Sequence, residues 1–261
     1  MTTPAPLEAL LDIALDAAEA AAHAVVDGWA RREDIEIQAK GAHDLTTSVD
    51  LAAEAAALAV IRSARPDDAI LAEESGQAGS ADQLWVIDPL DGPLNFSRGI
   101  PHCAVSVACL FRGEPQVAVI IDPLRSETFP AVRGGGARLD QTPLRVSPCA
   151  QLSGALVATV FPKQPERVAP QLPVIVRALE AGIALRRSGS MVLDLAYVAA
   201  GRFDGFWQAG MHPWDMAAGA LLVTEAGGRM RFAQGDGVLD ARACVAAGAS
   251  LIDSLTALAT A

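Results

Sequence analysis

The stretch Trp85–Phe96 reads WVIDPLDGPLNF and ends an apolar strand with two aspartates. Asp88 and Asp91 stand three positions apart, before a helix that we expect to begin near Pro93. Ligand sites in α/β proteins collect where strands end in such turns. Both carboxylates and the Leu90 carbonyl form an all-oxygen donor set, which suits a hard cation such as Mg²⁺ better than zinc. Taken alone, an Asx turn followed by a helix N-cap also explains both aspartates.

The composition of the chain limits the classes of function. The chain has 261 residues, enough for one large domain or two lobes, and its formal net charge is −11. A nucleic-acid-binding protein usually has a basic surface, so we expect no nucleic-acid partner. An acidic protein that binds an anionic substrate needs cations at its site, which also points to a metal. The four cysteines form no CxxC pair, which favours buried reduced thiols.

No segment has the pattern of a targeting or membrane sequence. Acidic residues interrupt the apolar residues of the N-terminal stretch, which argues against a signal peptide. No apolar run approaches the roughly 18 residues that a membrane span needs. We therefore expect a cytoplasmic protein that has no membrane partner.

Hydrophobic periodicity and turn residues predict the order of the elements. We expect helices over Leu7–Trp29, Ser48–Ala64, Val168–Ala181, Met191–Ala200, Pro213–Ala226 and Leu251–Leu258. We expect strands over Leu84–Ile87, Ala104–Phe111, Val117–Ile121, Glu127–Val132, Ala155–Val160, Ile183–Leu185, Phe203–Trp207 and Ala243–Ala247. The pattern changes near residue 147, which predicts an N-terminal α+β lobe over residues 1–147 and a C-terminal α/β lobe over residues 148–261.

Other acidic residues stand at comparable positions. Glu73 and Glu74 follow an apolar pair where another strand should end. Asp215 and Asp50 each fall in the first turn of an expected helix. Each has an ordinary explanation, because adjacent glutamates are usually solvated and an acid in a first turn favours the helix dipole without any further role.

Taken together and in this order, the acidic motifs resemble the inositol monophosphatase family of Mg²⁺-dependent phosphatases. The matching motifs are KGAHDLTTSVD (Lys40–Asp50), EES (Glu73–Ser75), WVIDPLDG (Trp85–Gly92) and PWDMAAGALLVTEAGG (Pro213–Gly228). The resemblance extends over nearly the whole chain, and the paired DPxDG and WDxAAG motifs are specific. It implies a layered αβαβα sandwich of the inositol monophosphatase and fructose bisphosphatase type, with the active site between two lobes and a homodimer as the usual assembly.

The resemblance also implies a role for each acidic residue. Glu73, Asp88 and the Leu90 carbonyl would bind a first Mg²⁺, and Asp88, Asp91 and Asp215 a second, in a site that holds two or three. Glu74 and Asp50 would orient or deprotonate the attacking water. The implied reaction is hydrolysis of a small phosphorylated substrate, with inositol-1-phosphate, which gives inositol and phosphate, as the default. Histidinol phosphate, 3′-phosphoadenosine 5′-phosphate and fructose bisphosphate remain alternative substrates.

Pro93 departs from the family pattern. The family normally reads DGT here, and its threonine hydroxyl works with the counterpart of Asp50 to position the water. Proline has neither a hydroxyl nor an N–H, although it suits the first position of a helix. Losing one preorganised donor typically costs about 10²–10³-fold in rate. The acidic ligands all remain, so the sequence also fits a weakly active or non-catalytic regulatory homologue, and bacterial relatives are known to be partners of the transcription machinery.

The residues that the resemblance places beside the substrate contain further departures. These residues are Gly92, Pro93, Leu94, Gly189, Ser190, Met191 and Gln208. The family often has a glutamate where Gln208 stands, and the amide keeps an acceptor while adding donors, which would shift the preference among polyols. Met191 replaces a smaller residue and either narrows the substrate wall or packs in the core.

Overall fold

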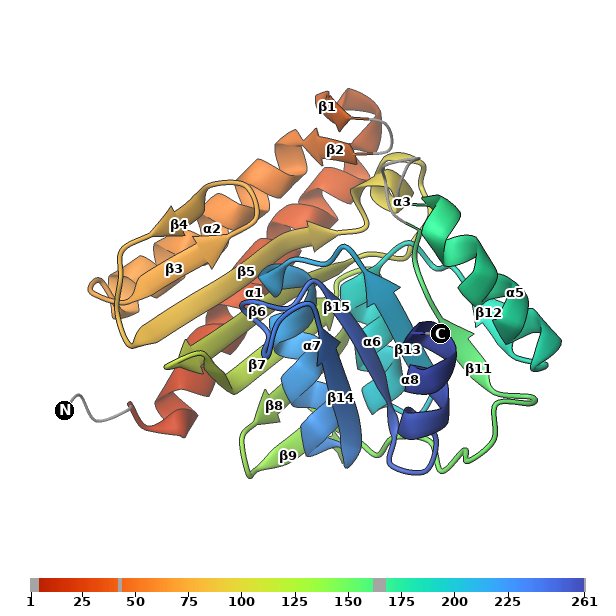
Figure 1. The fold of residues 1–261 in the computed structure, drawn as a ribbon. Helices are drawn as coiled ribbons and strands as arrows, with labels where there is room; N and C mark the ends of the chain where they lie inside the picture. The colour runs from red at the N-terminus through yellow and green to blue at the C-terminus, as the bar shows by residue number, and fades with distance from the viewer. Residues whose placement is uncertain (1–4, 42–43, 162–167, 261) are drawn as a thin grey trace.

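The computed structural model describes residues 5–41, 44–161 and 168–260. Of the predicted motifs, Ala42 and His43 lie outside these residues. Helices and sheets alternate through the molecule as an αβαβα sandwich (Figure 1). The predicted layered fold is therefore confirmed.

The first outer layer is a pair of long helices, α1 (Leu7–Ala30) and α2 (Ser48–Ala64). They pack on each other and cover one face of the larger sheet with alanine and leucine side chains. The helices approach closely at Gly28, where an added Cβ would lie 2.4 Å from a methyl carbon of Val49. The absence of a side chain at Gly28 therefore permits this crossing.

The larger sheet has eight strands in the order β10-β9-β8-β7-β6-β5-β3-β4. Their bounds are β3 (Ala69–Ala72), β4 (Gly76–Ala78), β5 (Gln83–Asp91), β6 (Ala104–Phe111), β7 (Glu114–Asp122), β8 (Glu127–Val132), β9 (Gly136–Leu139) and β10 (Thr142–Pro143). Trp85 and Ile87 point into the core beneath α1 and α2, whereas Val86 points into the core on the other face. Burial on both faces explains why β5 reads as a continuous apolar run.

One pairing in this sheet matters for function. β3 and β5 are parallel, with Ala72 opposite Ile87, whereas the other neighbours in the sheet are antiparallel. Parallel strands end at the same edge of a sheet. The residue after β3, Glu73, therefore lies beside the end of β5 and donates its N–H to the Ile87 carbonyl at 3.2 Å.

The central helical layer consists of α6 (Met191–Ala199) and α7 (Pro213–Glu225), which lie between the two sheets. From Met216 to Val223 every residue of α7 is buried. A helix that is apolar on all sides is typical of an element enclosed by its neighbours. The N-terminal turn of α7 carries Asp215.

The second sheet has five strands in the order β12-β11-β13-β15-β14. Its bounds are β11 (Leu156–Ala158), β12 (Ala184–Arg186), β13 (Gly205–Ala209), β14 (Gly228–Ala233) and β15 (Ala243–Gly248). The pairs β11–β12 and β11–β13 are parallel, and β13–β15 and β15–β14 are antiparallel. Helices α5 (Leu172–Glu180) and α8 (Ile252–Thr260) cover its outer face.

Short elements complete the chain near the end of β5. They are the 3₁₀ turns η1 (Arg32–Asp34) and η2 (Ala169–Gln171), the paired strands β1 (Ile37–Gly41) and β2 (Asp44–Thr47), and the helix α3 (Pro93–Ser97). Strand β2 packs against α3 (Figure 1). None of the described helices combines the length and apolar character that a membrane crossing requires.

The element predictions agree with the structure, with local differences. The helix over Ser48–Ala64 and the strand over Ala104–Phe111 have the predicted bounds. The strand predicted over Phe203–Trp207 begins and ends two residues later, and β14 was not predicted. The predicted boundary between the lobes at residue 147 falls in the segment between β10 and β11, and we keep it as a proposal.

The close packing of α6 on α7 gives a stability prediction. A Cβ at Gly219 would lie 2.6 Å from two side-chain carbons of Leu195. Gly219→Ala should therefore lower the free energy of unfolding by about 1–3 kcal/mol through overpacking. Urea unfolding in EDTA measures this change, with Ser254→Ala on the exposed side of α8 as a control. A gain in stability, which helix propensity alone predicts, would contradict the packing argument.

Candidate active site

One cavity is lined by acidic residues from separate parts of the chain. Glu73 follows β3, Asp88 and Asp91 end β5, and Asp215 stands in the first turn of α7. Leu90 also lines this cavity although its side chain is buried in the core, so its contribution to the cavity is main chain. The remaining lining residues are Gly92, Pro93, Leu94, Asn95, Val160, Phe161, Arg187, Gly189 and Met191.

Asp88 is held at an irregularity in β5. The register with β6 shifts between Asp88 and Asp91, and the strand predicted over Leu84–Ile87 in fact runs from Gln83 to Asp91. The Asp88 carboxylate accepts the Leu90 N–H at 3.1 Å and is 1% exposed. It also shares a hydrogen bond with Glu73. Asp88 therefore has a fixed orientation between Glu73 and the turn of β5.

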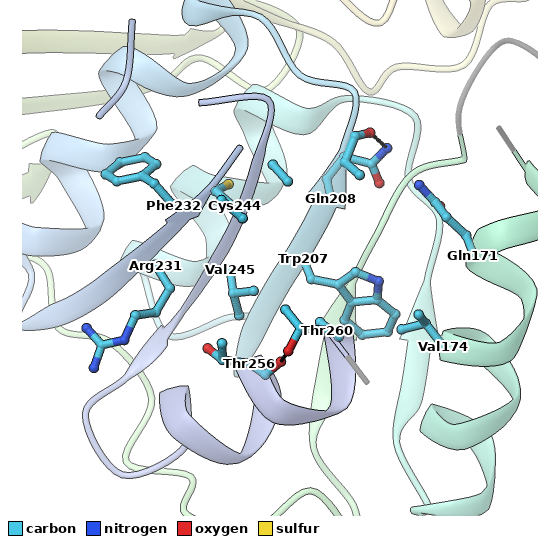
Figure 2. A pocket seen from close by; sticks show the side chains of 14 residues that line it. Gln171, Val174, Trp207, Gln208, Arg231, Phe232, Cys244, Val245, Thr256 and Thr260 are labelled. Atoms are coloured by element: carbon cyan, nitrogen blue, oxygen red, sulfur yellow. Dashed lines mark hydrogen bonds between the residues drawn. The ribbon is translucent and has the colours of Figure 1, made fainter. Parts of the chain in front are cut away.

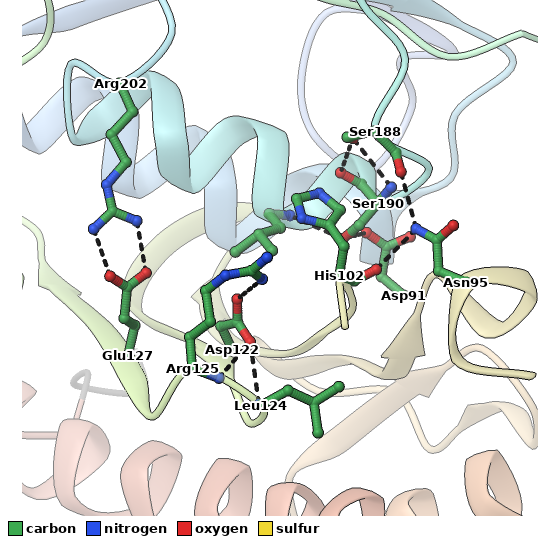
Figure 3. A network of polar contacts seen from close by, with 11 residues as sticks. Asp91, Asn95, His102, Asp122, Leu124, Arg125, Glu127, Ser188, Ser190 and Arg202 are labelled. Carbon is green, nitrogen blue, oxygen red and sulfur yellow. Dashed lines mark hydrogen bonds and ion pairs between the residues drawn. The ribbon is translucent and has the colours of Figure 1, made fainter. Parts of the chain in front are cut away.

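Asp91 is fixed from the second half of the chain. One of its oxygens, Oδ2, accepts the Ser190 hydroxyl at 2.6 Å and the Val192 N–H at 2.7 Å, both from the start of α6 (Figure 3). Ser190 is fully buried and also accepts the N–H of Leu193. Ser190 was predicted to contact substrate, but the structure places it behind Asp91 and outside the lining of the cavity.

Asp215 has the helix-terminal position that the sequence predicted. Its Oδ2 accepts the His212 N–H at 2.6 Å, which completes a capping box at the start of α7. Asp215 therefore caps its helix, as an acidic residue in a first turn commonly does, and the same side chain also lines the cavity. Asp215 is 6% exposed.

The electrostatics of the cavity favour a cation. Burial raises the pKa of Asp88 well above its ordinary value, and the nearby carboxylates of Glu73, Asp91 and Asp215 raise it further. Like charges this close are costly unless a cation offsets them. Carboxylate and carbonyl oxygens, without sulfur or nitrogen, are the donor set that a hard divalent cation prefers. The residues present therefore fit such an ion.

The described side chains do not themselves form a closed metal cage. Among the described residues, no three His, Cys, Asp or Glu side chains stand in a group that would hold an ion as they are. The carboxyl groups instead bond within the protein: Asp88 and Glu73 share a hydrogen bond that favours the protonated form of Asp88, and Asp91 accepts the Ser190 hydroxyl. Glu73, Asp88, Asp91 and Asp215 nonetheless line one cavity.

Glu74 and Asp50 lie in a layer behind the cavity. Neither lines it, and both are held by threonines of β2. Thr47 donates its N–H to Asp50 at 2.8 Å, and its hydroxyl bonds to the same oxygen, which closes the capping box of α2. Burial raises the pKa of Asp50 from 3.8 to about 6, and the Glu74 charge adds to the effect.

Asn95 is a residue of the site that the sequence analysis missed. Its Nδ2 donates to the carbonyls of His102 and Ser188, at 2.9 Å each, and so ties α3 to the loop before α6 (Figure 3). A Cβ at Gly189 would lie 2.8 Å from this amide nitrogen, and Gly189 has φ +93°. Only glycine suits both conditions. The motif placed Asn95 near Asp91, but no local signal connected it to Ser188.

Val160, Phe161 and Arg187, which also line the cavity, were missed as well. The Arg187 guanidinium lies 5.3 Å from the centre of the Phe161 ring, and both line the cavity. Arg187 is adjacent to the predicted segment that begins at Gly189, which was the available signal. Of the residues predicted to contact substrate, Gly92, Pro93, Leu94, Gly189 and Met191 line the cavity, and their contact with substrate stays a prediction.

Gln208 lies in the wall of a different cavity (Figure 2). Its Oε1 accepts the Val160 N–H at 2.9 Å, and its Nε2 donates to the Ala209 carbonyl at 2.8 Å. This second cavity, between the smaller sheet and the helices α5 and α8, is mostly apolar and has no acidic residue in its lining. It therefore lacks the chemistry to hold a divalent cation.

Comparison with known proteins agrees with this geometry. Residues 6–260 match the model of the inositol monophosphatase family. The chain belongs to this family. It is 46% identical to the Nus factor SuhB of Pseudomonas aeruginosa over 229 residues, which cover 85% of this chain and 84% of the relative.

Solved structures of this family have the same fold. The extragenic suppressor protein suhB from Bartonella henselae superimposes with a TM-score of 0.91 at 34% identity, covering 97% of this chain and 98% of that one. The inositol monophosphatase from Anabaena gives a TM-score of 0.84 at 35% identity, covering 97% and 95%. The inositol monophosphatase family uses divalent metals. The sequence predicted that this chain has no nucleic-acid partner. The comparison does not support that prediction, because the relative from Pseudomonas aeruginosa is named a Nus factor.

The raised pKa of Asp50 predicts a pH-dependent stability. The folded-state pKa of Asp50, near 6, lies above the ordinary value of 3.8. The contribution of Asp50 to the free energy of unfolding is therefore most favourable below about pH 4 and is lost as the pH rises through 6. Asp50→Asn mimics the protonated carboxyl. In EDTA at pH 7.5 this variant should be more stable than the native protein by up to about 3 kcal/mol.

Chemical denaturation of both proteins from pH 4 to pH 7.5 measures this difference. The gap between their free energies of unfolding should close toward pH 4. A gap that does not change across this range would contradict the assigned titration of Asp50.

Proposed function

We propose that this protein hydrolyses a small phosphate monoester with Mg²⁺, inositol-1-phosphate being the first substrate to test. One observation carries the proposal. Glu73, Asp88, Asp91 and Asp215, from three separate segments of a chain in the inositol monophosphatase family, line the same cavity. Phosphate monoesters are among the slowest compounds to hydrolyse in water, so their hydrolysis demands concentrated positive charge at the phosphate.

In this proposal the acidic residues hold two or three Mg²⁺ ions. Glu73, Asp88 and the Leu90 carbonyl would bind one ion, and Asp88, Asp91 and Asp215 a second. When bound, such ions polarise the phosphate, lower the pKa of water and stabilise the leaving oxygen. The hydrogen bonds from Leu90, Ser190 and His212 keep the carboxylates in place, so binding requires less ordering of side chains.

Glu74 and Asp50 are proposed to act on the attacking water. A carboxylate with a pKa near 6, like that of Asp50, is suited to accept a proton at neutral pH. Glu74 directly follows the proposed ligand Glu73, so its side chain starts from the edge of the same cavity. The two carboxylates interact electrostatically, so a proton taken by one lowers the repulsion felt by the other.

The wall of the cavity would position the ester. Gly92, Pro93 and Leu94 line it together with Gly189 and Met191, and the Asn95 amide links the two segments through the Ser188 carbonyl. Gly92 has φ +93°, and a Cβ there would lie 3.1 Å from the His102 carbonyl, so this turn depends on glycine. Inositol-1-phosphate, histidinol phosphate, 3′-phosphoadenosine 5′-phosphate and fructose bisphosphate form the panel of substrates to compare. We also propose a homodimer, which sedimentation velocity tests.

Asp91→Asn tests the assignment of the metal ligands. The amide keeps the hydrogen bond from Ser190 but removes the charge, so Mg²⁺-dependent phosphate release should fall at least about 10²-fold. Far-ultraviolet circular dichroism should be unchanged. Asp67→Asn, on an exposed turn, is the matched control and should keep native activity. Turnover retained by Asp91→Asn would count against the metal site.

Pro93→Thr tests the departure from the family pattern. Threonine would restore a hydroxyl and an N–H at the first position of α3, and a preorganised donor typically contributes about 10²–10³-fold in rate. We expect kcat to rise by at least about tenfold on inositol-1-phosphate at saturating Mg²⁺. An unchanged kcat would mean that the chain positions the water with other groups.

The second candidate function is a regulatory binding protein that keeps the metal centre. Two observations favour it: Pro93 weakens the expected water-positioning machinery, and the relative from Pseudomonas aeruginosa is named a Nus factor. The two functions separate in one experiment. Calorimetry measures Mg²⁺ binding, and a phosphate assay measures turnover on the substrate panel. Mg²⁺ binding without turnover on any ester would favour the regulatory function.

A further inference from the structure

Two adjacent threonines hold the two carboxylates assigned to the attacking water. The Thr46 hydroxyl donates to Glu74, at 3.1 Å from Oε1 and 3.2 Å from Oε2. The next residue, Thr47, binds Asp50 through its N–H and hydroxyl. Thr47 also caps α2 and so has a structural purpose, whereas Thr46 is 5% exposed and its hydroxyl caps no helix. The Thr46 hydroxyl therefore requires a separate explanation.

The main chain at Glu74 is fixed as well. The Glu54 carboxylate on α2 accepts the N–H groups of Glu74 at 2.8 Å and Ser75 at 2.9 Å. Glu74 is thus held from α2 through its backbone and from β2 through its side chain. A half-buried glutamate with no role would ordinarily keep its rotamer freedom in water. Restraint at both ends indicates that the direction of the Glu74 carboxylate matters.

The place of Thr46 in the fold connects it to the departure at Pro93. Strand β2 packs against α3, which begins at Pro93. Pro93 and Glu73 line the same cavity, and Glu74 follows Glu73 directly. Thr46 therefore belongs to the strand that contacts α3, the helix whose first residue, Pro93, has no hydroxyl.

We propose that Thr46 is a positioning residue that supplies, through Glu74, part of the hydroxyl control of the attacking water that Pro93 does not give. This inference rests on the proposed phosphatase function. Thr46 is not among the residues that line the cavity, and its hydroxyl acts by restraining the direction of the Glu74 carboxylate. Metal ligation does not depend on it, because the proposed ligands have their own donors in Leu90, Ser190 and His212.

Thr46→Val and Thr46→Ser separate the hydroxyl from the packing of the side chain. Valine keeps the shape and removes the donor, whereas serine keeps the donor and removes a methyl group. On inositol-1-phosphate with saturating Mg²⁺, Thr46→Val should lower kcat about 10–100-fold with KM within about twofold. Thr46→Ser should recover most of the rate. Thr142→Val, on the exposed edge strand β10, should match the native protein.

Combination with Pro93→Thr gives the decisive test. If the two hydroxyls control the same water, the Thr46→Val substitution should cost less than about threefold in kcat once Thr stands at position 93. Equal cost in both backgrounds would overturn the inference. A kcat of Thr46→Val within twofold of native, or a Thr46→Ser as slow as Thr46→Val, would overturn it as well.

A measurement without turnover completes the design. The Mg²⁺ dissociation constant of Thr46→Val, from calorimetry, should stay within about twofold of native, because Thr46 is not a ligand. A loss of Mg²⁺ affinity in proportion to kcat would overturn the positioning role. The two proposals also fail differently. If neither the native protein nor Pro93→Thr releases phosphate from any ester, the phosphatase function itself is wrong. If both do and Thr46→Val equals native, only the Thr46 inference is wrong.

Discussion

The parallel pairing of β3 with β5 is the constraint on which the candidate site depends. Because both strands end at the same sheet edge, Glu73 lies next to Asp88 although fifteen positions separate them in the sequence. An antiparallel pairing would place Glu73 at the opposite end of β5. The first turns of α6 and α7 then meet this same edge, where they hold Asp91 and Asp215. Every proposed ligand thus sits at the beginning or end of an element or, for Asp88 and Leu90, at the irregularity close to the end of β5.

Holding these acids together conflicts with stability, and the structure reduces the conflict only in part. Main-chain and hydroxyl donors fix Asp88, Asp91 and Asp215, and two of the three acids stand near helix N-termini, where negative charge is favoured. The pKa of Asp88 nevertheless stays well above its ordinary value. The metal-free chain is therefore under electrostatic strain at this point, and binding of a divalent cation would stabilise the folded state.

Local patterns in the sequence predicted the acids and most elements, but not the orientation of single polar side chains. The helix Ser48–Ala64 was predicted with its observed bounds because its apolar spacing is regular and its first turn is capped. The direction of the Gln208 side chain was not predicted, because it is set by a hydrogen bond from the Val160 N–H, which lies just beyond the end of another strand. Strand β14 was missed because it is an edge strand that alternates arginine with apolar residues and reads as polar.

A division between the proposed metal ligands and the groups proposed to act on water explains how this chain tolerates Pro93. The proposed metal ligands are carried by long elements that pack in two large cores. Loss of one proposed ligand would leave a buried cluster of carboxylates that binds the proposed cation less well. The groups proposed to act on water come instead from the ends of elements, Glu74 from the turn after β3 and Asp50 from the first turn of α2, and Pro93 begins the short helix α3. A substitution there changes one hydrogen bond and leaves the cores intact. In the proposed function, metal binding and turnover therefore depend on different groups, which offers a physical route from one role to another in a family whose members include a protein named as a Nus factor.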